Sequence, residues 1–235
     1  MPQLPRRAAH RGPTLVRLLS RLTDVDAPQS EASLSTQLSQ WLGWTDAIAL
    51  SAALNGNPPP ASAGVRAPDG AEARDCARVR AALADAIADD GAPTAKRRGQ
   101  ARPSAQPEQT EAAVDYAAFR HRYLTTQQTM AMEISNLRVR LRKALSASRP
   151  EMARLAMVDA VMERVVGARE QNLLANVPTM LEAHFERLRQ TDAGAAGAPG
   201  AWLTQFRKDM QSVLLAELEI RFEPVEGLLA ALRAG

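Results

Sequence analysis

The chain has 235 residues, a formal net charge of +3 and 46% hydrophobic residues, of which few are aromatic. Ala and Leu supply most of the apolar content and favour helices, and no alternating run of Val, Ile, Thr or Tyr predicts a strand. The single cysteine, Cys76, excludes an internal disulfide and a cysteine-pair zinc site, and no apolar run is long enough to span a membrane. The sequence predicts an all-α protein of a reducing, cytoplasmic compartment.

The N-terminal part is predicted to hold a disordered basic tip over residues 1–11 and a small helical module over 12–56. Leucines at helical spacing follow Pro13 in the first short helix, a second helix ends at Gly43, and a third, capped by Thr45, runs to Leu54. We expect these three helices to form a small bundle. Its bulkiest buried side chains are expected to be Trp41 and Trp44.

The string QWLGWTDAIALSAAL, from Gln40 to Leu54, resembles the most specific part of an uncharacterised bacterial family known only as a domain of unknown function. The resemblance extends over most of the chain. It implies no activity, cofactor or catalytic residue. It does associate the chain with envelope-linked proton-channel and peptidoglycan-binding proteins, and so implies a place in an envelope-linked complex.

Residues 57–109 have the composition of a Pro- and Ala-rich linker that contains one helix, at about 71–89. Cys76, Val79, Leu83 and Ile87 recur along this helix at the spacing of a single buried face. The sequence therefore predicts a tethered helix between two flexible segments.

The stretch from Glu111 to Ser148 contains neither Gly nor Pro and predicts one long amphipathic helix. At 1.5 Å per residue such a helix is about 55 Å long, which exceeds the diameter of roughly 45 Å expected of a compact globule of this size. We therefore expect an elongated bundle built along it over 110–235. The predicted apolar stripe consists of Tyr116, Phe119, Tyr123, Met130, Ile134, Leu137, Leu141 and Leu145.

The rest of this bundle is predicted from proline positions. Pro150 favours the first turn of a helix that runs to about Ala175, and Pro178 is expected to break or kink it before a further helical segment. A last long helix is predicted over 201–222, and Pro224 is expected to restart a short terminal helix.

Arg138, Arg140, Arg142 and Lys143 form the strongest polar signal, in a segment (110–150) with a net charge of +4. Flanking charges of this kind pair with acidic neighbouring helices in bundles and coiled coils. We expect such partners among Glu217, Glu219, Glu223 and Glu226. The alternative is that the basic face contacts the phosphates of a nucleic acid.

Val114, Met132 and Val139 form a thin apolar line nearly opposite the main stripe of the long helix. Scattered exposed apolar residues are common. The sharper interpretation is that a protein partner, or a second copy of the chain, contacts the helix on this side.

No pattern in the sequence predicts catalysis, a cofactor or a metal site. His10, His121 and His184 lack further ligands at metal spacing, and Cys76 lies on an apolar stripe with no histidine near it. The sequence predicts a non-enzymatic structural or assembly protein that acts through helix–helix contacts. A nucleic-acid-associated protein is the alternative.

Overall fold

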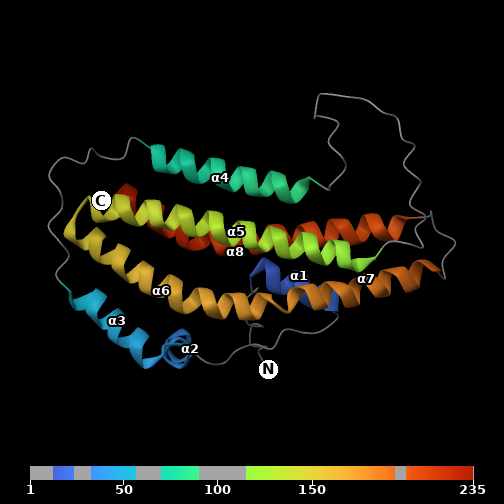
Figure 1. The fold of residues 1–235 in the computed structure, drawn as a ribbon, viewed down its shortest axis with the longest axis horizontal. Coiled ribbons are helices and arrows are strands. Elements are labelled where there is room, and N and C mark those ends of the chain that lie inside the picture. The colour runs from blue at the N-terminus through green and yellow to red at the C-terminus, as the bar shows by residue number, and fades with distance from the viewer. Residues whose placement is uncertain (1–12, 24–32, 57–69, 90–114, 194–199, 235) are drawn as a thin grey trace, which may run out of the picture.

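The computed structural model describes residues 13–23, 33–56, 70–89, 115–193 and 200–234, and its regular structure within these ranges is entirely helical (Figure 1). The predicted all-α fold is confirmed. The predicted tip and most of the predicted linker lie outside the described residues. None of the described helices combines the length and the apolar character that crossing a membrane requires.

Helix α5 (Tyr116–Ser146) lies at the centre of the structure and is somewhat shorter than the stretch from which it was predicted. Asp115 caps it, because its side chain accepts a hydrogen bond of 3.1 Å from the backbone nitrogen of Ala117. Of the eight residues of the predicted stripe, Phe119 is half-buried and the other seven are buried. The stripe therefore faces the main hydrophobic core.

Helix α6 (Pro150–Leu174) runs back along α5 after a short turn, with Pro150 in its first turn as predicted. Helix α7 (Val177–Ala193) continues it almost in line (Figure 1). The interruption falls at Ala175 and Asn176, just before Pro178, because a proline is accommodated in the first turn of a helix but not in its interior.

Helix α8 (Ala201–Ala234) packs along α5 and supplies more buried side chains than any other described helix. The predicted restart at Pro224 is wrong, since α8 continues through this residue. A proline inside a helix costs about 3 kcal/mol. Phe222, Val225 and Leu228, all buried around the proline, offset that cost.

The N-terminal helices do not form the predicted small bundle. Helix α1 (Thr14–Thr23) packs on α7 and α8, whereas α2 (Leu34–Trp41) and α3 (Trp44–Asn55) pack on α6. No substantial contact joins α1 to α2 or α3 within the described residues. Short helices have little apolar surface to share with each other, so each gains more by packing on a longer helix.

Helix α4 (Ala71–Ala88) packs alongside α5 and α8, and the four residues of its predicted apolar face are buried. Its register is fixed by polar contacts as well. Arg80 pairs with Glu226 of α8 at 2.5 Å, and Arg122 of α5 donates to the backbone carbonyl of Asp89 just beyond α4.

An aromatic cluster joins α5, α7 and α8 at the N-terminal end of α5. The ring of Phe206 lies 5.0 Å from that of Phe185 and 5.2 Å from that of Phe119, both in edge-on geometry. Tyr116 and Trp202 complete the cluster, and the Tyr116 hydroxyl donates to the backbone carbonyl of Pro178. Aromatic packing of this kind stabilises beyond the area that it buries.

Removal of the central ring tests the importance of this cluster. Phe206→Ala should lower the free energy of unfolding by about 3–5 kcal/mol, because it leaves a cavity against the rings of Tyr116, Phe119 and Phe185. Leu215→Ala on the same helix, where the side chain is 39% exposed, is the control and should cost less than about 1 kcal/mol. Urea unfolding followed by circular dichroism measures both, and equal losses would place the core elsewhere.

Candidate functional site

Arg138 and Arg142 lie between α5 and α6, where they pair with two carboxylates of α6. Arg138 Nη2 is 2.6 Å from Asp159 Oδ1, and Arg142 Nη1 lies 2.8 Å from Asp159 Oδ2 and 2.6 Å from Glu163 Oε2. All four side chains are at most 24% exposed. We call these four residues the ion-pair seam. Burial acts to lower the pKa of Arg142, but hydrogen bonds to Glu163 and Asp159 outweigh it and raise that pKa.

The other two cations of the predicted cluster point elsewhere. Arg140 pairs with Asp75 of α4 at 2.8 Å. Burial acts to raise the pKa of Asp75, but hydrogen bonds from Arg140 and Arg78 outweigh it and hold that pKa below its usual value. Lys143 is exposed, and no ion pair of its side chain is present among the described residues.

The prediction that the arginines pair within the chain is thus confirmed for three of them, but the predicted partners are wrong. The acids of α8 do not meet the arginines, because the turn after Ser146 brings α6, and not α8, against this flank of α5. Glu217 instead faces Tyr123, and Glu226 faces Arg80 on α4.

A buried carboxylate, Glu217, occupies the middle of the bundle and has no exposed surface. Its carboxylate accepts hydrogen bonds from the Tyr123 hydroxyl at 2.7 Å and from Gln127 Nε2 at 3.0 Å. Arg221, one turn further along α8, pairs with it at 2.8 Å and also contacts Glu170 of α6 at 2.9 Å. Burial, and then the adjacent carboxylate, raise the pKa of Tyr123 well above its ordinary value, so the phenol remains a donor.

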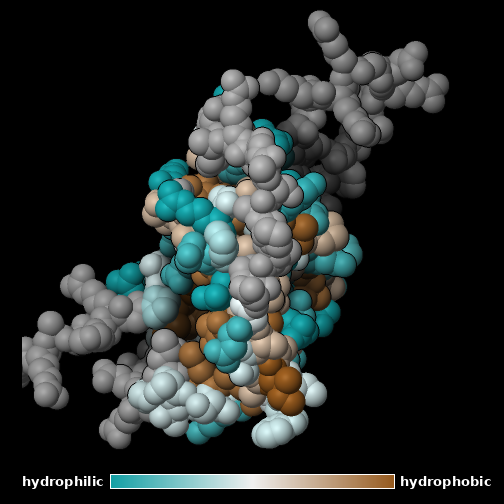
Figure 2. Space-filling view, turned by 90° about the vertical axis from the view of Figure 1, so that its left-hand side faces the viewer, coloured by the Kyte–Doolittle hydropathy of each residue, from teal (hydrophilic) through white to brown (hydrophobic). Residues whose placement is uncertain are grey.

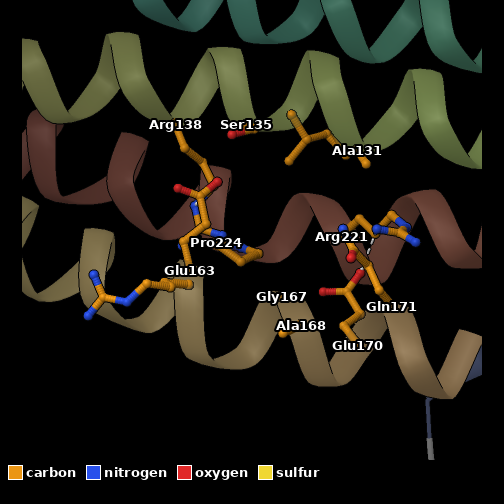
Figure 3. A pocket seen from close by; sticks show the side chains of 12 residues that line it. Ala131, Ser135, Arg138, Glu163, Gly167, Ala168, Glu170, Gln171, Arg221 and Pro224 are labelled. Atoms are coloured by element: carbon orange, nitrogen blue, oxygen red, sulfur yellow. Dashed lines mark ion pairs between the residues drawn. The ribbon is translucent and has the colours of Figure 1, made fainter. Parts of the chain in front are cut away.

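A cleft of about 360 Å³ opens beside this network between α5, α6 and α8. Figure 3 shows Arg138 and Glu163 towards one end of it, and Arg221 with Glu170 towards the other. Burial raises the pKa of Glu170, Arg221 acts against this, and Glu217 adds to it. The charged side chains that line the cleft already have partners, with Arg164 paired to Asp46 at 3.4 Å. Among the described residues, each charged side chain of the cleft is therefore already in an ion pair.

The histidines and the cysteine have structural surroundings where they are described. His184 Nε2 lies 2.8 Å from Asp209 Oδ2, His121 is exposed, and His10 lies outside the described residues. Cys76 is buried, and burial raises the pKa of its thiol. No group of residues able to hold a metal ion is present in the described part of the chain.

Helix α3 presents a feature that the sequence analysis did not predict. Its inner side packs Ala53, with Ala49 and Leu50, against Val161 and Val165 of α6. Its outer side exposes Trp44, Ile48 and Leu54 at 82%, 54% and 51%. The prediction that Trp41 and Trp44 are both buried is wrong, since Trp44 is exposed and Trp41 is only half-buried.

We call the outer side of α3 the α3 patch; it consists of Trp44, Ile48 and Leu54 with the small exposed residues Ala47, Ser51 and Ala52. Residues 33–56 contain a single charged residue, Asp46, and this carboxylate pairs with Arg164 of α6. In Figure 2, brown and pale residues dominate the lower part of the molecule, where α3 lies in Figure 1. The patch is thus apolar and without charge of its own.

A sequence signal for this patch exists. The segment WTDAIALSAALN is apolar on all sides of its helix, and such a helix is normally enclosed on all sides. Only one side of α3 is enclosed by the described part of this chain.

Two of the three residues of the thin apolar line predicted on α5 lie in the described part of the chain. Met132 and Val139 are 57% and 54% exposed on the outer side of the helix, while Val114 lies outside the described residues. Seven residues, or about 10 Å along the helix, separate the two. The α3 patch, by contrast, has six exposed uncharged residues within eleven positions of its helix.

The structure therefore defines an all-helical protein with an internal ion-pair seam and one uncharged, apolar outer helix face. Residues 1–234 match the family described as "Protein of unknown function (DUF3348)", and the chain belongs to that family. No curated protein and no solved structure matches the chain.

Charge reversal tests the ion-pair seam. Arg138→Glu with Arg142→Glu should lower the free energy of unfolding by about 3–5 kcal/mol, because two partly buried carboxylates lose their partners and face two more. Adding Asp159→Lys and Glu163→Lys should recover part of that loss. Lys143→Glu is the control and should change stability by no more than about 0.5 kcal/mol. Thermal and urea unfolding measure all three, and a double reversal as mild as the control would contradict the seam.

Glu170 should give the chain a distinctive pH dependence. Its pKa in the folded chain lies above the ordinary value of 4.5, so its ionised form opposes folding at neutral pH, and this effect fades as the pH falls through the raised pKa. Glu170→Gln should therefore raise the melting temperature at about pH 7 and lose that advantage towards about pH 4.5. Melting curves of the wild type and the variant across this pH range measure the difference. A variant whose melting-temperature advantage grew on acidification would contradict the raised pKa of Glu170.

Proposed function

We propose that this chain is a non-enzymatic assembly protein that acts through helix–helix contacts, with the α3 patch as its contact surface. The observation that carries the proposal is the exposure of Trp44, at 82%, beside Ile48 on a helix face that bears no charge. Charged residues are depleted, and tryptophan is enriched, at the centres of protein interfaces. A cytoplasmic location and an envelope-linked complex belong to the same proposal.

The energetics favour an interface on this face. An aromatic side chain buries roughly 150–250 Å² when it is enclosed. At about 25 cal/mol per Å², enclosure of Trp44 alone would contribute several kcal/mol before the costs of association. The helix that carries Trp44 is already held in place, because α3 is packed on α6 and its Asp46 is paired with Arg164.

The alternative function is nucleic-acid binding through the basic side of α5. It is supported by the net charge of +4 over residues 110–150. Three of its four clustered cations, however, are engaged by Asp159, Glu163 and Asp75. A phosphate backbone would have to displace these carboxylates, so we favour the assembly role.

Site-specific photocrosslinking in living cells tests the proposal. A benzoylphenylalanine at position 44 should give one discrete protein adduct, because this side chain would lie inside a contact. The same group at Gln128, exposed on α5, is the control and should give none. No adduct at position 44, or the same adducts at both positions, would remove the basis of the proposal. A salt-sensitive complex of the purified chain with mixed-sequence DNA, weakened by Lys143→Glu, would support the alternative.

A further inference from the structure

We infer that the occupant of the α3 patch is a second copy of this chain, with two α3 helices packed face to face about a two-fold axis. The inference rests on the proposed function and names its partner. It would bring Trp44 of each copy over the small residues of α3 in the other, with the two Ile48 side chains close to the axis.

Charge is the first reason for choosing a second copy. In a two-fold interface the same surface meets itself, so any charge near the axis faces its own like. The single charge within residues 33–56, Asp46, lies on the inner side of α3 and is paired with Arg164. The neighbouring cation Arg169 is held over the ring of Trp41 at 5.7 Å. Within the described part of the chain, α2 and α3 themselves therefore bring no unpaired charge to such a contact.

The same neutrality argues against a partner chosen by charge. Interfaces between different proteins use complementary charges to steer encounter and to reject wrong partners. The α3 patch supplies no such charge, and its exposed neighbours on α2 are uncharged polar residues, Ser35, Thr36, Ser39 and Gln40. Discrimination on this surface would rest on shape and apolar contact alone.

The shape of the patch also suits a pair of identical helices. Ala47, Ser51 and Ala52 are small and exposed, so two helix axes can come close, and the distance between packed helices is set by the side chains at the contact. Trp44 and Ile48 are one turn apart and project beside them as knobs. Antiparallel α3 helices would place the knobs of each copy over the small residues of the other.

The size of the patch sets the expected affinity. A stable interface covers about 800 Å² on each partner, and smaller ones belong to transient complexes. Helices α2 and α3 comprise 8 and 12 residues, or about 12 and 18 Å of helix, so the patch falls at the small end of this range. We therefore expect a reversible dimer with a dissociation constant on the order of 10–100 µM.

Sedimentation velocity of the purified full chain tests the inference. Between about 1 and 300 µM the sedimentation coefficient should rise from that of a monomer towards that of a dimer. Trp44→Glu and Ile48→Glu should each weaken the association about 30-fold or more, as expected of interface hot spots. Met132→Glu replaces a comparably exposed apolar residue on α5, and as the matched control it should leave the association unchanged. Circular dichroism should show all variants folded, because the replaced side chains are exposed.

A mixing experiment identifies the second copy as the occupant. Ile48→Glu and Ile48→Lys should each be monomeric alone, since each places like charges across the axis. Their equimolar mixture should regain a dimer, and this dimer should weaken with added salt. If the mixture stays monomeric while the wild type dimerises, the two α3 patches do not meet and the inference is wrong.

The remaining outcomes separate this inference from the proposed function. A wild-type chain that stays monomeric throughout, but whose position 44 crosslinks to a different protein in cells, overturns the second copy and leaves the assembly role supported. A monomer without any adduct at position 44 overturns both. A dimer that tolerates Trp44→Glu places self-association on another surface and also overturns the inference.

Discussion

The hydrogen-bonded carboxylate of Glu217 is the constraint on which the arrangement of the bundle depends. A buried charge is tolerated only when its hydrogen-bonding capacity is met, and here the donors come from Tyr123 and Gln127 of α5 and from Arg221 of α8. Glu170 ties α6 to the same guanidinium. A shift of α5 by one residue would move its donors by 1.5 Å and rotate them by about 100°, leaving Glu217 unpaired. Apolar stripes alone tolerate such shifts more readily, so the network fixes the register of three helices.

Two further sets of contacts hold α5 on either side of this point. Towards its N-terminus the rings around Phe206 join it to α7 and α8, and towards its C-terminus the ion-pair seam joins it to α6. The three sets differ in chemistry, so a helix shifted or reversed would present rings to carboxylates. This pattern gives one arrangement a large advantage over its competitors, which is what specifies a single fold.

The sequence predicted what local periodicity and capping determine, and missed what depends on tertiary contacts. The buried stripe of α5 and the buried face of α4 follow from helical spacing alone. The acids that meet Arg138 and Arg142 depend on which helix the turn after Ser146 brings alongside, and spacing does not encode that. The exposure of Trp44 also depends on a tertiary contact. Helix α3 is apolar on both sides, and the position of α6 decides which side is covered. Pro224 shows the same limit, because a local rule predicted a break that the burial of Phe222 and Val225 overrides.

The distribution of charge connects the fold with the proposed role. Most folded chains keep charge at the surface and apolar side chains inside. In this chain several arginines and carboxylates form ion pairs between α5, α6 and α8. The outer helix α3 has an uncharged outer side that carries the exposed Trp44. The internal charges fix the position of α6, and α6 in turn holds α3 with its outer side exposed. The exposure of Trp44 is thus a consequence of the same packing that gives the bundle its register, and α3 can present this side chain to a partner without any rearrangement of the core.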